Sequence, residues 1–204
     1  MHTAITPFAL VRWKSPRTPG EPRQSGWAGT SPEFGEIRVV WPALPHATGA
    51  VAAEVTGGRL PAARFETRGL HADLVSRPTL NRAVCRVDGR LVAMERDRWA
   101  VTHRGRALRM RYLGDDYRLT ALGKHAYRLE RLRDDEDPGV VVTAHEAGLG
   151  SGRRVTLRAA GRVLAADLAL AALFAGVDRS VLTRRGAVRA GVRRVFGFWA
   201  EATY

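Results

Sequence analysis

The sequence predicts a mainly β protein: an antiparallel barrel or rolled sheet around one hydrophobic helix, with an additional basic C-terminal helix. Three observations predict this fold class. Short segments of β character, separated by turn residues, follow one another from Glu36 to about residue 160. The stretch RVLAADLALAALFAGV, Arg162–Val177, is the most apolar of the chain, and the segment that follows it is rich in arginine.

Residues 1–35 are expected to form an extended or disordered tail. The piece SPRTPGEPRQSGWAGTSP consists largely of turn-forming residues and has no hydrophobic period. Half of the 10 prolines of the chain lie in these residues, namely Pro7, Pro16, Pro19, Pro22 and Pro32. We therefore expect the folded β domain to cover residues 36–177, and the basic helix to cover residues 178–204.

Two hairpins are predicted in the middle of the β domain. AVCRVDGRLVAME has Asp88-Gly89 as a two-residue turn, which is the strongest short hairpin signal. RWAVTHRGRALRMRY suggests a second hairpin that turns at Arg104-Gly105 and pairs Trp99 with Met110 and Val101 with Leu108.

A further turn at Gly114-Asp115 would place Tyr112 opposite Tyr117 and Met110 opposite Leu119. In this register one face of three strands is apolar. The tyrosines, Tyr127 included, are therefore expected in the core, with Arg109 and Arg111 on the opposite face.

The apolar helix is expected over Val163–Val177, inside the protein. Its 15 residues are fewer than the roughly 20 that cross a bilayer. A helix that is apolar all round must be covered by protein on every side. A closed or nearly closed barrel would cover it and would also remove exposed strand edges.

The succession of CRVDGRLVAMER, YRLTALGKHAYRLERL and GRRVTLRAAG, ending in LAADLALAALFA, resembles the tubby C-terminal-like group. That group includes the LURP-one-related and scramblase-like proteins and has bacterial members. The resemblance covers about residues 80–177 and implies a twelve-stranded barrel around a central helix, in a non-enzymatic protein. Characterised relatives bind phosphoinositides or act at membranes. The resemblance assigns no lipid-binding residue here, and this chain continues beyond the central helix.

Charge and cysteine content narrow the function classes. The chain has 33 basic and 20 acidic residues, a net charge of +13, so attraction to anionic partners is expected. A lone cysteine, Cys85, excludes an intramolecular disulfide and a multi-cysteine metal site, and fits a cytoplasmic setting. The histidines lie singly, without catalytic or ligand spacing. We expect neither an enzyme nor a cofactor or metal.

The segment LTRRGAVRAGVRRVFGFWAEATY contains the most suggestive surface residues. As a helix, it places Arg185, Arg189 and Arg193 on one stripe, with Arg194 further round and Phe198 and Trp199 nearby. This pattern is typical of helices that lie on a membrane surface or dock on a partner. The alternative is a helix packed against the outside of the barrel, with solvated arginines.

Further anion contacts are expected at Arg109 and Arg111 on the strand faces, and at Arg153 and Arg154 in GLGSGRR. The glycines of GLGSGRR resemble a phosphate-binding loop, but such a loop precedes a helix, and here a strand is predicted to follow. A glycine-rich turn is the favoured interpretation.

These features favour a cytoplasmic binding or scaffold protein, peripheral at the membrane in one version. It would contact an anionic membrane surface or a protein partner through its C-terminal helix. One alternative is a structural subunit of a homo- or hetero-oligomeric assembly. The other is nucleic-acid binding through the same arginines, which would weaken steeply with salt.

Overall fold

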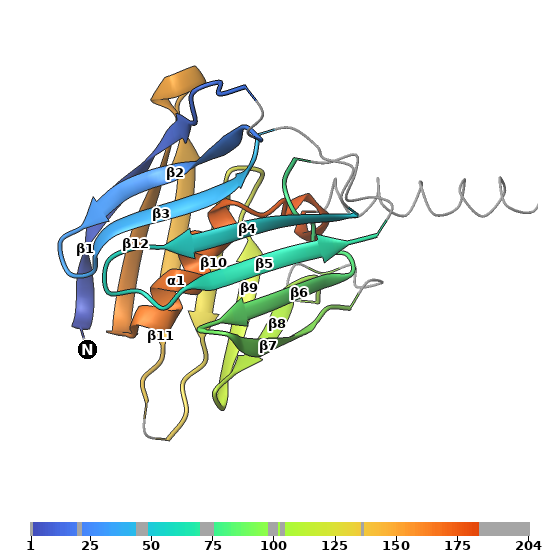
Figure 1. Ribbon diagram of the computed structural model, residues 1–204. Helices are drawn as coiled ribbons and strands as arrows, with labels where there is room; N and C mark the ends of the chain where they lie inside the picture. Colours follow the sequence, from blue (N-terminus) through green and yellow to red (C-terminus); the bar gives the residue numbers. More distant parts are fainter. Residues whose placement is uncertain are drawn as a thin grey trace, which may run out of the picture.

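Twelve antiparallel strands close into a barrel around one helix, α1, in the computed structural model (Figure 1). Strands adjacent in sequence pair with each other, and β1 pairs with β12 to complete the ring. The structure describes residues 2–19, 22–43, 49–69, 76–97, 102, 105–135 and 137–183. The predicted fold class, a barrel around a hydrophobic helix, is confirmed.

The strands are β1 His2–Lys14, β2 Gln24–Ser31, β3 Gly35–Pro42, β4 Ala50–Thr56, β5 Ala63–Arg68, β6 Ala83–Val87, β7 Arg90–Glu95, β8 Leu108–Tyr112, β9 Asp115–Ala121, β10 Ala126–Arg131, β11 Val140–Ala147 and β12 Arg154–Val163. Helix α1 is Ala165–Ala175, and short 3-10 turns are η2 Gly150–Gly152 and η3 Ser180–Leu182. Among the described residues, no helix has the length and apolar character needed to span a membrane.

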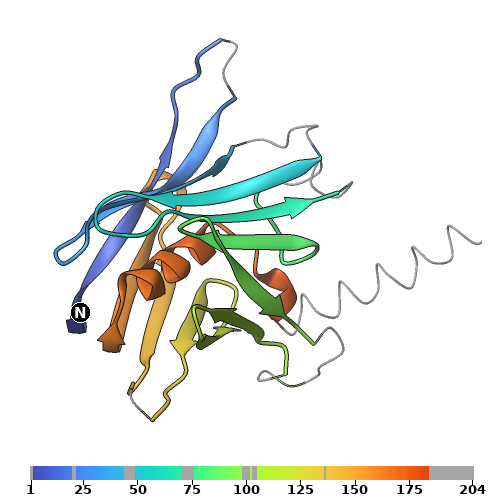
Figure 2. The same ribbon diagram turned by 60° about the horizontal axis from the view of Figure 1, so that its bottom comes forward.

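Helix α1 occupies the interior of the barrel, as Figure 2 shows. Every residue from Asp167 to Ala175 is buried, because inward-facing side chains of the strands cover the helix on all sides. Phe174 meets Phe65 of β5 edge to face at 5.6 Å. Trp27 of β2 donates its indole N–H to the carbonyl of Ala175 at 3.0 Å. The all-round apolar sequence of the helix thus matches an all-round apolar environment.

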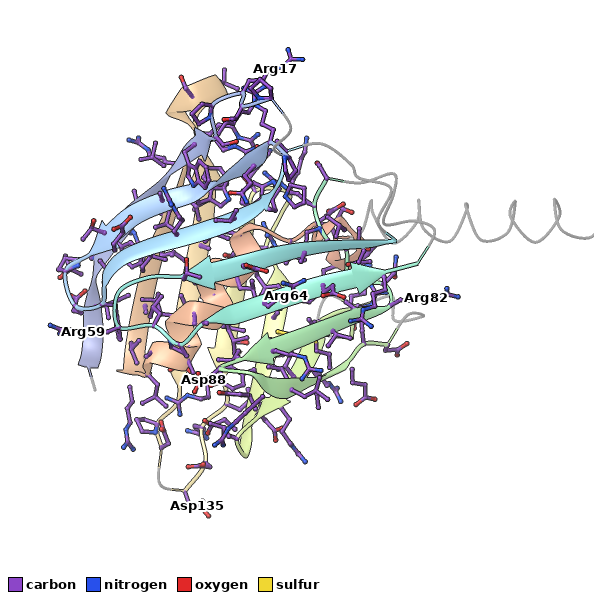
Figure 3. The ribbon with its side chains drawn as sticks, viewed as in Figure 1. Arg17, Arg59, Arg64, Arg82, Asp88 and Asp135 are labelled. Atoms are coloured by element: carbon purple, nitrogen blue, oxygen red, sulfur yellow. The ribbon has the colours of Figure 1, made fainter. Side chains whose placement is uncertain are left out.

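Charged side chains project from the outer face and the loops, among them Arg59, Arg64 and Asp135 (Figure 3). The alternation that produces this is clear in β8, where Leu108, Met110 and Tyr112 are buried between exposed arginines. The expected core positions of Tyr112, Tyr117 and Tyr127 are confirmed.

The prediction of a tail over residues 1–35 is wrong, because β1 and β2 occupy most of that range. Ile5, Phe8 and Leu10 are buried at positions that face the core. Pro7 falls between Ile5 and Phe8, where the pairing of β1 with β12 shifts register. A proline is tolerated there because a bulge needs no regular ladder hydrogen bond. Other prolines of this region fall in the loop between β1 and β2.

The hairpin at Asp88-Gly89 is confirmed, since β6 and β7 pair Val87 with Arg90 across this turn. The hairpin at Arg104-Gly105 is wrong. Met110 of β8 pairs with Met94 of β7, not with Trp99. Trp99, Val101 and Arg104 lie outside the described residues.

The turn between β8 and β9 consists of Leu113 and Gly114, which makes the predicted register wrong by two residues. Tyr112 lies opposite Asp115, and Met110 opposite Tyr117. Leu113 and Gly114 have φ values of 52° and 94°, and a two-residue I′ turn requires positive φ at both positions. Because the shift is even, each residue keeps its predicted face.

Candidate functional site

Arginines gather at the end of the barrel where α1 finishes. We define the cationic end as Arg12, Arg77, Arg153 and Arg179. Arg12 lies near the end of β1, and its backbone N–H donates to the carbonyl of Arg153, just before β12, at 2.9 Å. Arg77 lies between β5 and β6, and Arg179 follows α1. Barrel closure brings these four distant positions together.

Aromatic rings support the guanidinium groups of the cationic end. Arg12 lies 4.7 Å from the ring centre of Trp41 and 5.3 Å from that of Trp27. The guanidinium of Arg77 also lies 4.7 Å from the ring centre of Trp41, and that of Arg153 lies 6.0 Å from the ring centre of Trp27. A planar guanidinium stacks on such rings and keeps its edge N–H groups available for hydrogen bonds.

Arg179 contacts a third aromatic ring, at 4.2 Å from the centre of Tyr127. Its Nη1 donates to the carbonyl of Phe174, and to that of Val177 at 2.9 Å. These carbonyls lie at the C-terminal end of α1, where the helix dipole favours a cation. In the described part of the chain, Arg179 is therefore held by the carbonyls at the end of α1, a contact that Arg12, Arg77 and Arg153 do not make.

Negative charge at this end is scarce. Arg153 pairs with Glu146 of β11, whose side chain is largely buried. Within the described part of the chain, Arg12, Arg77 and Arg179 make no ion pair. The buried Nη1 of Arg12 has no hydrogen-bond partner there either. A buried donor without an acceptor is costly, and the positive charge that remains uncompensated at this end attracts external anions.

The pKa values of Arg77 and Arg12 also indicate an excess of positive charge at this end. The pKa of Arg77 is lowered to about 10, mainly by burial and in addition by the charges of Arg12, Arg179 and Arg153, while Glu146 opposes them. Burial, followed by repulsion from Arg153, also lowers the pKa of Arg12. Both groups are still cations at neutral pH, held where positive charge is unfavourable.

A cavity of about 220 Å³ opens at the cationic end. The residues that line it come from three loops, from the end of β11 and from the segment after α1, and they include Arg77, Lys124, His125, Glu146, Arg153, Asp178, Arg179 and Thr183. Arg153 is the one predicted anion contact that lies here. The arrangement suits the binding of a small anion by several guanidinium groups.

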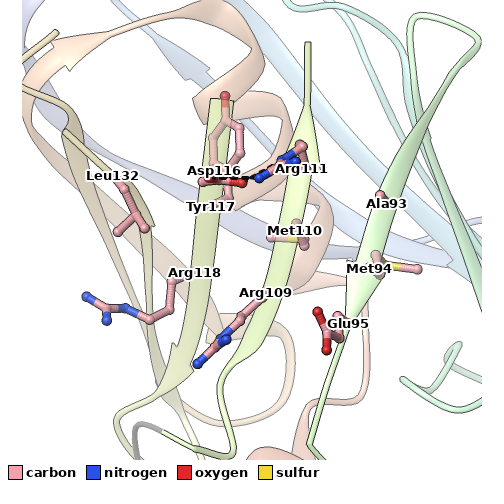
Figure 4. A pocket seen from close by; sticks show the side chains of 10 residues that line it. All are labelled: Ala93, Met94, Glu95, Arg109, Met110, Arg111, Asp116, Tyr117, Arg118 and Leu132. Carbon is pink, nitrogen blue, oxygen red and sulfur yellow. Dashed lines mark hydrogen bonds and ion pairs between the residues drawn. The ribbon is translucent and has the colours of Figure 1, made fainter. Parts of the chain in front are cut away.

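A second hollow, of about 560 Å³, lies over β7, β8 and β9 and contains the predicted contacts Arg109 and Arg111 (Figure 4). Its charges are largely balanced. Arg111 pairs with Asp116 at 2.9 Å, and Arg109 lies opposite Glu95 in the pairing of β7 with β8. This hollow is larger than the cavity of the cationic end, but it has no comparable excess of positive charge.

A buried polar network closes the opposite end of the barrel. Asp167, near the start of α1, accepts hydrogen bonds from Arg131 Nε at 3.0 Å and Tyr117 Oη at 2.9 Å. Burial raises the pKa of Asp167, whereas the Leu164 N–H, Arg131 and Tyr117 lower it. Arg131 also pairs with Asp137 at 2.5 Å. Each charge is satisfied within the protein, so the network stabilises the fold and leaves no group for a ligand.

The other predicted residues lie apart from this cavity or outside the described residues. Arg154 is exposed at the first position of β12. The strand that follows GLGSGRR agrees with a turn and not a phosphate loop. The remaining predicted contacts lie outside the described residues: Arg185, Arg189, Arg193, Arg194, Phe198 and Trp199.

Sequence reasoning missed Arg12, Arg77 and Arg179. The alternation Phe8, Leu10, Arg12 in β1 could have indicated an inward-facing arginine. The place of Arg179, directly after an apolar helix, matches the preference for cations at helix C-termini. We find no local sequence signal for Arg77.

Two further expectations concern chemistry. In the described ranges, no group of three or more His, Cys, Asp and Glu residues is placed to hold a metal ion. Cys85 is fully buried, and burial raises the pKa of its thiol to about 12, as fits a packing residue.

Comparisons with known proteins identify no relative of established function. No family model matches the chain, and no curated protein matches it. Among solved structures, the chain is similar to the di-domain ARO/CYC StfQ from the steffimycin biosynthetic pathway. The identity is 10%, over 96% of this chain and 83% of that one, with a TM-score of 0.21. That TM-score is too low to support a conclusion, and membership of the tubby-like group stays a prediction.

Proposed function

We propose that this chain is a non-enzymatic binding protein that meets an anionic membrane surface with its cationic end and the segment 184–204. The observation that carries the proposal is the excess of positive charge at one end of the barrel, where Glu146 is paired with Arg153 and the other arginines of the cationic end have no carboxylate partner among the described residues.

The segment 184–204 is continuous with this end. Thr183, the last described residue, lines the cavity of the cationic end. The chain then continues with Arg184, Arg185, Arg189, Arg193 and Arg194, against Glu201 as its acidic residue. It also contains Phe198 and Trp199, and basic sequences with such aromatic residues are typical of membrane-surface segments. The described part of the chain therefore ends at the cationic end, and the basic segment follows it in sequence.

The magnitude of the attraction is sufficient. A basic residue near an anionic leaflet contributes about 1 kcal/mol. The five arginines of the segment, together with Arg12, Arg77 and Arg153, would contribute several kcal/mol, and burial of Trp199 would add to this attraction. An attraction of this size fits a cytoplasmic protein held peripherally at the membrane. The resemblance to the tubby-like group supports the same class of function.

The test is co-sedimentation of the full-length protein with vesicles of phosphatidylcholine and about 30% phosphatidylserine, measured at a series of salt concentrations. We expect binding at low salt, weakened at least tenfold when Arg185, Arg189, Arg193 and Arg194 are all changed to glutamine. The matched control is Arg109→Gln with Arg111→Gln, which removes arginines from the outer hollow and should leave binding nearly unchanged.

Three results would overturn the proposal. One is absence of vesicle binding at low salt. Another is vesicle binding that the quadruple variant retains in full. The third is a mass that rises with concentration in a protein that ignores vesicles, which would indicate an assembly subunit. A parallel titration with duplex DNA separates the nucleic-acid alternative, which requires tighter binding to DNA than to vesicles at equal salt.

A further inference from the structure

We infer that the cavity at the cationic end is a binding site for a phosphomonoester dianion, held by Arg77, Arg153 and Arg179. The inference rests on the proposed function, since it names the anionic group that this end of the barrel recognises. The ester can be a lipid headgroup or a free metabolite, and the experiment below separates these sources.

The charges around the cavity call for about two negative charges. Its cations are Arg77, Lys124, Arg153 and Arg179, and its carboxylates are Glu146 and Asp178. Counting only the Arg, Lys, Asp and Glu side chains of the described residues, four cations less two carboxylates leave two positive charges. Both carboxylates already have partners, because Glu146 pairs with Arg153 and Asp178 accepts the N–H of Ser180 at 2.8 Å. A dianion would neutralise the remainder, whereas a phosphodiester, with one charge, would neutralise half of it.

Arg77 is the residue best placed to contact the anion. Its guanidinium stacks on Trp41, and within the described residues it makes no hydrogen bond or ion pair. Its edge N–H groups are therefore available for bidentate binding of phosphate oxygens. Arg12 contacts the same ring of Trp41 and lies behind this group, where its charge adds to the attraction without lining the cavity.

The size of the cavity limits the ligand. At about 220 Å³ it is smaller than the roughly 300 Å³ at which pockets for drug-sized ligands begin. It equals the volume of about seven water molecules. A phosphate group with a few waters fits this space, and the rest of the ligand would lie outside. Recognition is therefore of the phosphate group and not of the whole molecule.

The first arm of the test uses soluble probes on the full-length protein. Glycerol 3-phosphate and dimethyl phosphate, a monoester and a diester, are titrated by calorimetry at constant ionic strength and pH 7.5. We expect the monoester to bind at least tenfold more tightly. Arg77→Gln should weaken monoester binding at least tenfold, Arg77→Lys should fall between, and Arg109→Gln should have no effect.

Folding of the Arg77 variants is checked without ligand. Arg77 is a cation that repels Arg12 and Arg179, so Arg77→Gln should leave the thermal midpoint of the unliganded protein near that of the wild type. A folded Arg77→Gln protein that retains full monoester affinity overturns the inference. Equal affinity of the wild type for monoester and diester also overturns it.

The second arm uses vesicles that contain phosphatidic acid, a phosphomonoester, or phosphatidylserine, a phosphodiester, at matched surface potential. Preference for phosphatidic acid, together with glycerol phosphate binding, supports the site and a lipid source. Binding of glycerol phosphate without vesicle binding supports the site with a free ester as ligand, and overturns the proposed membrane function. Equal vesicle binding without glycerol phosphate binding overturns the site alone.

Discussion

Asp167→Asn tests the buried network at the start of α1. The carboxylate of Asp167 accepts hydrogen bonds from the Leu164 N–H at 2.8 Å, from Tyr117 Oη at 2.9 Å and from Arg131 Nε and Nη2 at 3.0 and 3.4 Å. Asparagine has the same shape, but it is neutral and its amide nitrogen cannot accept a hydrogen bond. In the Asp167→Asn variant an amide NH₂ group, itself a donor, replaces one accepting oxygen and faces the donor groups around it. Arg131 also loses the negative charge of Asp167.

The expected loss follows from burial. The side chain of Arg131 is 1% exposed and that of Asp167 is 0% exposed, so water cannot replace the lost contacts. Breaking a buried ion pair by removing one partner costs roughly 3–5 kcal/mol. Arg131 retains Asp137 at 2.5 Å, which places the expected loss in the free energy of unfolding at the lower end, about 3 kcal/mol.

Urea unfolding at pH 7 measures this loss. The set comprises Asp167→Asn, Arg131→Met and the double variant. We expect the double variant to lose less than the sum of the single losses, with a coupling of about 1.5 kcal/mol or more. The control pair, Arg118 and Glu130, is 35% and 19% exposed and should contribute less than about 1 kcal/mol. A loss below about 0.5 kcal/mol for Asp167→Asn, or additive losses, would refute the reasoning.

Two further predictions concern acid stability and the thiol. The Thr6 N–H, at 2.7 Å, is the main reason that the pKa of Glu33 falls to about 2, so Glu33 stabilises the fold above about pH 4.5 and this stabilisation is lost as the pH falls towards 2. Glu33→Gln should therefore lower the free energy of unfolding in urea by about 1 kcal/mol at pH 7, a figure reduced for solvent screening, and by progressively less at pH 4 and pH 3. A loss that does not change with pH, or an equal loss for the control Glu36→Gln at an exposed position, contradicts this. The thiol of Cys85, with its pKa raised to about 12 by burial, should react with a disulfide reagent only as fast as the protein unfolds, and rapid reaction in the native state contradicts its burial.

Local signals in the sequence were enough for several elements. The Asp88-Gly89 turn was predictable because a two-residue hairpin depends on the residues in the turn itself. Helix α1 was predictable because its 15-residue apolar run has one favourable environment, the interior. The faces of β8 and β9 were also predictable, since alternation assigns each residue to a side of the sheet.

Pairing between distant segments was not predictable in the same way. An alternating pattern is unchanged by a shift of two residues, which is why the register of β8 and β9 was wrong while their faces were right. Prolines suggested a tail where β1 lies, because the bulge that accommodates Pro7 depends on β12. The cationic end was only partly predictable: Arg153 was a candidate, but Arg12, Arg77 and Arg179 become its neighbours through barrel closure.

The pairing of β1 with β12 has a consequence for synthesis of the protein. The first strand leaves the ribosome long before the last one, and α1, which fills the interior, follows β12. Until β12 and α1 have been synthesised, the first eleven strands of the nascent chain therefore lack the helix that fills the barrel, and β1 lacks its pairing partner. Chains dominated by such distant pairings fold slowly, and they expose apolar surface and unpaired strand edges until folding is complete. Folding should thus be largely post-translational, and a stalled chain that ends before Ala165 should be a substrate for chaperones.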